Sequence, residues 1–353
     1  MKKLLLILVI ISCICAACFR IDRGAEENVT VSTDIQKSGF EKEPLKPVST
    51  LYYNGVDYRM SRSDSGKYGG QIVVSTIGEG PKTFNPWVSK DATSSEIGDL
   101  MYDSLMSTDP ETGEVIPYLA KEMKVSDDLK TFTIYLRRGV KWSDDKEITA
   151  DDVVFTWNDI ILAGFGNTSL RDSVLIDGEY PKVTKIDKYT VEFKIKKPFA
   201  PFQRFVGTQI APKHIFESVI KKGAKYFDSY LSTTVNPKDI VCSGAFILDE
   251  YVPAQRVVLK RNPNYYAIDE NKNLLPYIDK YVILIVGDLN NEMLKFEAGE
   301  IDIISVRGKD LPRFKAKEKK SDFKIYNLGP NTGTMFLVFN MNTRKDKDGK
   351  YYV

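Results

Sequence analysis

The sequence predicts a mixed α/β protein with two domains and a long N-terminal extension. Segments that alternate apolar and polar residues, typical of strands, are interleaved with segments of helical periodicity. The chain has 353 residues, of which 42% are hydrophobic and 11% aromatic, enough for a large buried core. Its length favours two domains.

The N-terminus has the pattern of a secretory signal peptide. Met1-Lys2-Lys3 precedes an apolar run over residues 4–11, and small residues and cysteines follow. A short membrane anchor is the alternative, because about 18 residues is close to the minimum for a spanning helix. Ala16 and Ala17 favour cleavage, so we assign residues 1–17 to the signal peptide. Residues 18–66 are rich in Glu, Lys, Ser, Thr and Asp, which predicts a flexible tether.

The body begins near Gly69 and shows strands and helices by their periodicity. We expect strands at residues 71–75, 129–140, 188–196 and 281–286, and helices at residues 94–105, from 149 onward and at 290–298. Ser94 or Ser95 is the expected N-cap of the first helix, and Thr149 with Asp151 and Asp152 caps the second. The apolar residues 335–339 form a last strand with no compact element after it, which predicts a truncated chain.

Composition excludes several functional classes. The chain has 50 basic and 48 acidic residues, a net charge of +2, so nothing points to nucleic acid. After cleavage only Cys18 and Cys242 remain, which excludes a disulfide scaffold. With His214 as the single histidine, zinc sites and histidine-based triads are disfavoured. We therefore expect no enzyme, no cofactor and no metal site.

Three features could suggest chemistry, and each has a simpler interpretation. The acidic cluster at residues 144–145 and 151–152 is better explained by helix capping and a solvated turn than by a metal. We expect Cys242 to be buried and inert rather than a reactive thiol. We expect His214 to cap a helix or lie at the surface.

Several motifs resemble family 5 of the extracellular solute-binding proteins of ABC importers. The strongest matches are Pro117-Tyr118-Leu119-Ala120-Lys121-Glu122 and residues 125–144 and 148–155. Further matches in the family's order occur at residues 84–86, 102–105, 186–191, 198–202, 243–246, 258–266 and 299–302. The resemblance covers residues 69–342. The family usually has Gly where this chain has Asp145, so we expect a changed turn there, because a positive φ costs more without Gly.

The segment Ala16-Ala17-Cys18 resembles a bacterial lipobox, in which the cysteine is acylated and becomes the mature N-terminus. Cys15 stands where the family usually has Leu, and Cys13 is a competing lipidation site. Cleavage before Cys13 would leave only about eight apolar residues, so Cys18 is favoured. This resemblance implies an extracytoplasmic protein, lipid-anchored to the cell membrane or in the periplasm of a bacterium.

The family resemblance implies a periplasmic-binding-protein-like fold (type II, cluster C) with two lobes and a solute between them. The first lobe would have a main subdomain, residues 69–114 plus 236–335, and an inserted subdomain, residues 115–235. Residues 336–353 would begin a second lobe that is largely missing.

The implied function is solute binding for an ABC importer. The solute would be a peptide or a similar small molecule, and the other partners would be the permease and ATPase complex, with the protein as a monomer. First-lobe residues that match the family's ligand-binding segments are Lys90, Ala92, Thr93, Ser94, Ser243, Gly244 and Ala245. The alternative is a surface lipoprotein of the same fold that acts as an adhesin or signalling receptor. Adjacent permease and ATPase genes would favour transport.

Overall fold

The computed structural model describes residues 46–109 and 112–327, together with the isolated positions 337, 339, 344, 349 and 350. The chain divides into two compact units, residues 45–309 and a second unit that includes the residues from 310 onward. The signal peptide with Cys13 and Cys18, the tether up to residue 45 and most of the predicted strand at 335–339 lie outside the described residues. Across the described ranges, no helix combines the length and the apolar character that a membrane span requires.

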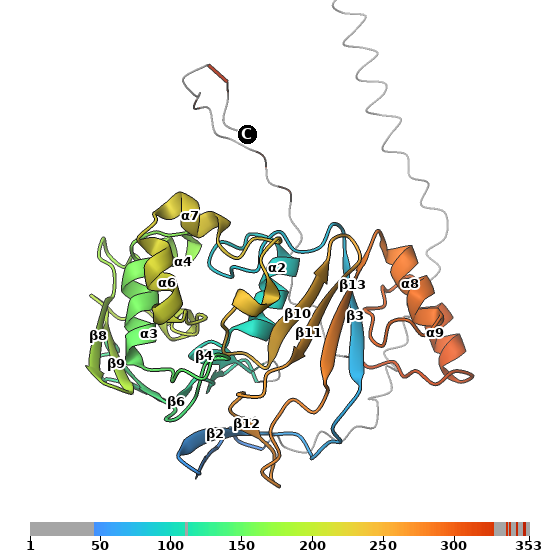
Figure 1. The fold of residues 1–353 in the computed structure, drawn as a ribbon, viewed down its shortest axis with the longest axis horizontal. Coiled ribbons are helices and arrows are strands. Elements are labelled where there is room, and N and C mark those ends of the chain that lie inside the picture. The colour runs from blue at the N-terminus through green and yellow to red at the C-terminus, as the bar shows by residue number, and fades with distance from the viewer. Residues whose placement is uncertain are drawn as a thin grey trace, which may run out of the picture. The chain divides into compact units, whose positions relative to one another are not determined.

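The first sheet of the larger unit has the strand order β10-β11-β13-β3 (Figure 1). Its strands are β3 (Gln71–Ile77), β10 (Phe246–Val252), β11 (Arg256–Arg261) and β13 (Lys280–Val286). β3 runs parallel to β13, with Gln71 opposite Lys280, whereas the other pairs are antiparallel. The sheet therefore combines a strand from residues 71–77 with strands that follow residue 245.

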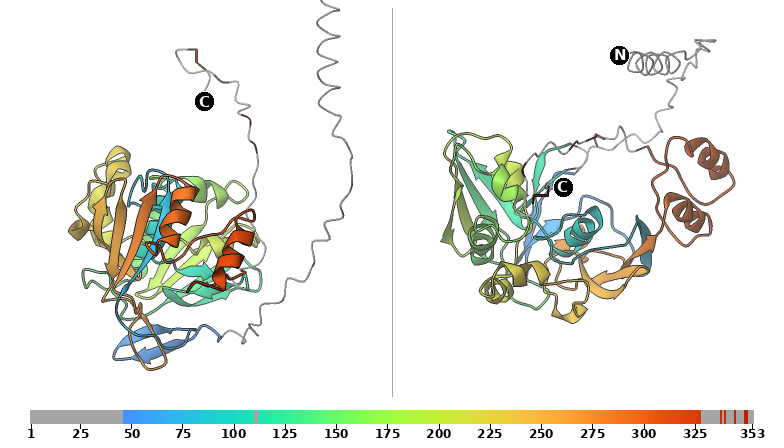
Figure 2. Two further views of the ribbon diagram at one scale, coloured as in Figure 1. Left: turned by 90° about the vertical axis from the view of Figure 1, so that its right-hand side faces the viewer. Right: turned by 90° about the horizontal axis from the view of Figure 1, so that it is seen from above.

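The second sheet has the order β6-β7-β9-β8 and is antiparallel throughout. Its strands are β6 (Ala120–Val125), β7 (Thr131–Leu136), β8 (Lys182–Asp187) and β9 (Thr190–Lys194). Phe132, Ile134 and Leu136 are buried, and the residues between them are partly exposed, as the alternating pattern predicts. Seen from above, this green sheet lies on one side of α2 and the first sheet on the other (Figure 2).

Helices and short strands complete the larger unit. The α-helices are α2 (Ala92–Met101), α3 (Ala150–Phe155), α4 (Ser169–Ser173), α5 (Phe202–Phe205), α6 (Lys213–Ile220), α7 (Ala224–Ser229) and α8 (Leu289–Glu297). The remaining elements are β4 (Met106–Thr108), β5 (Val115–Pro117), β12 (Ala267–Ile268), the π-helix η1 (Thr156–Ile161) and the 3₁₀-helix η2 (Pro237–Asp239). α2 packs against β10, and α8 packs against β3 and β13.

The turn and cap before α3 follow the sequence closely. The Thr149 hydroxyl accepts a hydrogen bond from Asp151 N, and Thr149 N donates to Asp152 Oδ2 at 2.9 Å, which completes a capping box. Gly139 ends the preceding strand region with φ +72°, and a Cβ there would lie 2.5 Å from Gly55 O. Asp145 has φ +67°, a left-handed conformation that costs more for Asp than for Gly.

The predicted tether is folded in its last part, which corrects the sequence analysis. β1 (Thr50–Tyr53) and β2 (Val56–Met60) form an antiparallel hairpin, and β2 also pairs in parallel with β12. The two residues between the strands are Asn54 and Gly55, both with positive φ, which is the turn that favours a two-residue hairpin. We missed this hairpin turn because the polar composition of residues 18–66 favoured a flexible tether.

Side chains of the hairpin insert into the larger unit. Asp57 is 5% exposed, and its Oδ2 accepts hydrogen bonds from Arg138 N and Lys121 Nζ, both at 3.1 Å. The buried Arg137 donates from Nη1 to Thr50 Oγ1 at 2.8 Å. The hairpin is therefore held by buried polar contacts as well as by strand pairing.

One continuous hydrophobic cluster extends through the larger unit. Trp142 and Trp157 are fully buried in it, and Trp157 meets Phe193 edge-on at 5.1 Å between ring centroids. Both sheets contribute to this cluster.

The described part of the second unit contains α9 (Leu311–Glu318). Phe314 of this helix packs edge-on against Phe323, and Glu318 Oε1 accepts a hydrogen bond from Ile325 N at 2.7 Å. We predicted that the main subdomain extends to residue 335. In the structure the larger compact unit ends at residue 309, and the residues from 310 onward belong to the second unit.

Candidate functional site

The first predicted binding segment forms the start of α2. Asp91, with extended backbone, is the N-cap, and its Oδ1 accepts a hydrogen bond from Ser94 N at 2.9 Å. The expectation of Ser94 or Ser95 as N-cap is wrong, because the Asp91 carboxylate already satisfies the free N–H of the first turn. Lys90 and Ala92, on either side of Asp91, are exposed.

The next two residues of this segment hold the helix in place. Ser94 is 1% exposed, and its Oγ accepts hydrogen bonds from Lys82 N and Thr83 N at 2.8 and 3.2 Å. The Thr93 hydroxyl lies 2.7 Å from that of Thr76 at the end of β3. Ser94 therefore positions the loop after β3, and its hydroxyl is not presented to a solute.

The second predicted segment packs against the other end of α2. Ser243 Oγ accepts a hydrogen bond from Asp103 N at 2.9 Å, and Gly244 N donates to Met101 O at 2.7 Å. A Cβ on Gly244 would lie 2.4 Å from Leu100 O. The small residues therefore allow the α2 backbone to approach closely. Ala245 is partly exposed.

A groove of about 450 Å³, which we call the loop groove, adjoins the first segment. Its lining residues are Lys82, Thr83, Val88, Lys90, Asp91, Gly166 and Asp228. The first five follow the carboxyl end of β3, and open α/β sheets bind ligands outside the carboxyl ends of their parallel strands. Gly166 has φ +68°, and a Cβ there would lie 2.3 Å from Trp87 O, so glycine brings this backbone to the groove.

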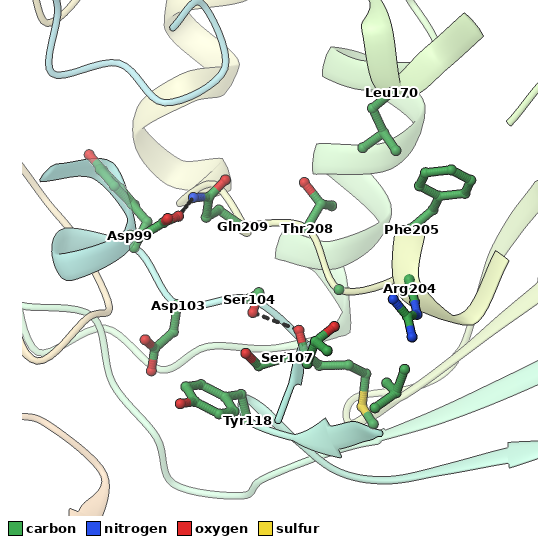
Figure 3. A pocket seen from close by; sticks show the side chains of 15 residues that line it. Asp99, Asp103, Ser104, Ser107, Tyr118, Leu170, Arg204, Phe205, Thr208 and Gln209 are labelled. Carbon is green, nitrogen blue, oxygen red and sulfur yellow. Dashed lines mark hydrogen bonds between the residues drawn. The ribbon is translucent and has the colours of Figure 1, made fainter. Parts of the chain in front are cut away.

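A second, larger hollow of about 540 Å³ lies beside the C-terminal half of α2, and we call it the α2 cavity (Figure 3). Asp99 and Asp103 contribute carboxylates to its wall, and Arg204 contributes a guanidinium. Hydroxyls of Ser107 and Thr208 lie between them (Figure 3). None of the seven predicted residues lines this cavity, although Ser243 supports it from behind by holding Asp103 N.

The two carboxylates of the α2 cavity have different surroundings. Burial raises the pKa of Asp103 to about 6, although Tyr266 OH, which donates to Oδ2 at 2.5 Å, and the Arg59 charge favour the carboxylate. Partial burial also raises the pKa of Asp99, against the hydrogen bond from Gln209 Nε2 at 2.5 Å. Asp103 is thus part of a buried network, whereas Asp99 has one amide partner.

Cys242 is buried as the sequence suggests, whereas His214 contacts a carboxylate instead of capping its helix. Cys242 is buried, burial raises the pKa of its thiol to about 12, and Sγ lies 3.7 Å from Phe246 O. The prediction of a buried thiol is confirmed. His214, at the start of α6, is partly buried, and its Nε2 lies 2.8 Å from Asp144 Oδ2. No side chain caps this helix by a hydrogen bond, so the expected capping role of His214 is not observed. No group of three potential metal ligands occurs among the described residues.

Sequence comparison finds relatives of this chain among the solute-binding proteins of bacteria. Residues 114–350 match the sequence profile of the bacterial extracellular solute-binding proteins, family 5 (middle region). A probable ABC transporter-binding protein of Deinococcus radiodurans is 34% identical over 270 residues, which cover 74% of this chain and 45% of the relative. The oligopeptide-binding protein AppA of Bacillus subtilis is 30% identical over 260 residues, 73% of this chain and 44% of the relative.

Solved structures show the same fold. The complex of Bacillus subtilis AppA with a nonapeptide superposes with a TM-score of 0.59 at 31% identity, over 72% of this chain and 47% of that one. The structure of MelB from Agrobacterium fabrum in complex with stachyose superposes with a TM-score of 0.61 at 25% identity, over 72% of this chain and 40% of that one. The chain thus spans about half the length of the curated relatives it matches.

Proposed function

Since the chain belongs to family 5 of the bacterial extracellular solute-binding proteins, we propose that it supplies the first-lobe wall of a solute site that serves an ABC importer. The solute is a peptide or a similar small molecule, held between this wall and a second lobe and delivered to the permease. Relatives named for oligopeptides and dipeptides support a peptide as the solute. The MelB complex with stachyose shows that a similar protein binds a different class of solute. Binding proceeds without catalysis.

The loop groove carries this proposal. Three segments that are distant in sequence meet there: the loop after β3, Gly166 after η1, and Asp228 of α7. Lys90 is exposed at the groove and forms no ion pair with any residue that the structure describes. Its ammonium is available to hydrogen-bond a solute, and the neighbouring Ala92 is exposed. Of the seven residues predicted from sequence, Lys90 lines the loop groove. We retain it as a candidate contact, together with the exposed Ala92 and the partly exposed Thr93 and Ala245, which do not line this groove.

Attachment to a membrane through a lipid on Cys18, with Cys13 as the alternative, forms part of the proposal. Several acyl chains at about 0.8 kcal/mol per buried CH₂ would hold the protein on a bilayer. Mass spectrometry of the mature N-terminal peptide from the native host checks this. An acylated Cys18 is the expected result, and an unmodified or uncleaved N-terminus would exclude the anchor.

Isothermal titration with tripeptide and nonapeptide libraries tests the solute proposal. Two proteins are compared: the 353-residue chain, and the chain extended by the coding sequence after codon 353 wherever the reading frame continues. We expect saturable binding by the extended chain and much weaker binding by the 353-residue chain, because half of a site contacts half of the solute. Nanomolar binding by the 353-residue chain would contradict the two-lobe arrangement.

Lys90→Ala in the extended chain should weaken peptide binding about threefold to tenfold, which corresponds to about 0.7–1.4 kcal/mol, the value of one hydrogen bond made at an exposed site. Lys182→Ala is the matched control, since this exposed lysine on β8 lies outside the groove. Absence of peptide affinity in the extended chain would refute the peptide class, and equal effects of both variants would remove Lys90 from the site.

A further inference from the structure

The α2 cavity has opposite charges on two sides, and neither charge is neutralised by the protein (Figure 3). Asp99 projects from α2 and accepts one hydrogen bond, from the Gln209 amide. Arg204 of α5 donates from Nη2 to Gly113 O at 3.1 Å. Within residues 46–109 and 112–327, neither Asp99 nor Arg204 forms an ion pair. Each is therefore free to bind an opposite charge on a ligand.

Asp103, the other carboxylate, is already neutralised and serves as a fixed wall. It is buried, Tyr266 donates to it, and the positive charge of Arg59 favours its ionised form. Arg59 is held in turn by Tyr265 OH at 3.2 Å and lies over the Tyr118 ring at 4.5 Å. The unmatched charges of the cavity are thus those of Asp99 and Arg204.

Neutral groups occupy the space between these two charges. The hydroxyls of Ser107 and Thr208 make no hydrogen bond to another residue in the described part of the chain, and Figure 3 places them between Asp99 and Arg204. Phe205 adds an aromatic ring on the Arg204 side and stacks on Phe199 at 6.1 Å, which fixes its position. The cavity thus offers hydroxyls for a polar backbone and a ring for an apolar side chain.

We propose that the α2 cavity is a second ligand site, which binds a short zwitterion of the amino-acid type with its ammonium group at Asp99 and its carboxylate at Arg204. A purely cationic ligand would leave Arg204 unmatched, and a purely anionic ligand would leave Asp99 unmatched. The volume of about 540 Å³ is within the range of small-molecule sites, about 300–1,000 Å³. A dipeptide supplies both charges, an amide for the hydroxyls and a side chain for Phe205.

This site is separate from the loop groove of the proposed function. The two hollows share no lining residue. All residues of the α2 cavity belong to the larger unit, so its ligand needs no second lobe. Binding there can therefore succeed or fail independently of solute capture.

Isothermal titration of the 353-residue chain with Ala-Phe tests the inference. N-acetyl-Ala-Phe and Ala-Phe-amide, which each lack one charge, are titrated in parallel. We expect Asp99→Asn to weaken Ala-Phe binding at least tenfold and to leave N-acetyl-Ala-Phe unchanged. Arg204→Gln should weaken Ala-Phe binding to a similar extent and leave the amide unchanged. This crossed pattern assigns each charge of the ligand to its residue.

Two controls separate this site from its surroundings. Glu96→Gln removes an exposed carboxylate from the same helix, outside the cavity, and should not change Ala-Phe binding. Lys90→Ala alters only the loop groove and should not change it either. The thermal unfolding midpoint of each variant is measured so that misfolded protein is not scored as loss of binding.

Three results would overturn the inference. The first is no saturable binding of Ala-Phe, phenylalanine or Ala-Ala-Phe. The second is loss of Ala-Phe binding in Lys90→Ala with none in Asp99→Asn, which would place the dipeptide in the loop groove. The third is equal affinity of the folded Asp99→Asn and Arg204→Gln variants and the unaltered chain for Ala-Phe.

Discussion

Asp57 offers a direct test of whether the N-terminal hairpin is part of the folded body. Its carboxylate accepts one hydrogen bond from the Arg138 backbone and one from the Lys121 ammonium, each at 3.1 Å, and the residue is 5% exposed. Asp57→Ala leaves the Arg138 N–H without its acceptor, at about 1–3 kcal/mol, and removes a hydrogen bond to a charged group, at about 1.5–3 kcal/mol. Lys121 can recover water because its side chain is 30% exposed.

We therefore expect Asp57→Ala to lower the free energy of unfolding by about 2–4 kcal/mol, which is roughly 30-fold to 1,000-fold in the unfolding equilibrium constant. Asp57→Asn keeps an acceptor for Arg138 N and should cost less. Urea unfolding at pH 7, followed by the fluorescence of the buried Trp142 and Trp157, measures both.

Asp64→Ala is the matched control for Asp57→Ala. The Asp64 side chain is 98% exposed and lies 3.7 Å from Lys46 Nζ, so its removal should change the stability by no more than about 0.5 kcal/mol. A stability of Asp57→Ala within 0.5 kcal/mol of the unaltered chain would refute the reasoning. Residues 46–60 would then behave as the tether that the composition suggests.

Three further predictions concern the contacts around α2. Gly244→Ala should destabilise the protein by about 1–3 kcal/mol, because its Cβ would overlap Leu100 O, whereas Gly287→Ala has free space and should be neutral in thermal unfolding. Asp103 has a pKa of about 6 in the folded protein and 3.8 ordinarily, so the folded state retains this proton between pH 4 and 6 while the unfolded state releases it. Stability relative to Asp103→Asn should therefore fall by about 2 kcal/mol from pH 4 to pH 7 in urea unfolding, and a flat difference would contradict the burial of its charge. The thiol of Cys242 should resist alkylation, read by mass spectrometry of its peptide, until the protein unfolds; rapid labelling in buffer would show that the site is open.

The elements with strong periodicity could be predicted from sequence. The alternation in β7, the apolar run of β13 and the helix α8, predicted at residues 290–298 and observed at Leu289–Glu297, need only local information. The capping box at Thr149 is equally local. β1 and β2 were missed although Asn54-Gly55 is a strong hairpin signal, because the surrounding composition was given more weight.

For the candidate binding residues, the sequence predicted the segments of the chain but not what their side chains contact. Ser94, Ser243 and Gly244 occur in the segments that resemble the family's binding loops, but their small side chains serve packing and hydrogen bonding around α2. The α2 cavity could not be predicted. Asp99 and Arg204 are ordinary surface residue types separated by about a hundred positions, and no local pattern shows that they face one hollow.

The parallel pairing of β3 with β13 determines when the larger unit can finish folding. Gln71 cannot meet Lys280 until the ribosome has synthesised nearly the whole unit, and closing so long a loop is slow. Until then both edges of β3 lack a neighbouring strand and can associate with other chains, whereas one of them is paired in the folded unit. If the chain is exported as its N-terminus suggests, this edge has to be protected during export, and truncation before residue 280 would leave β3 without its partner.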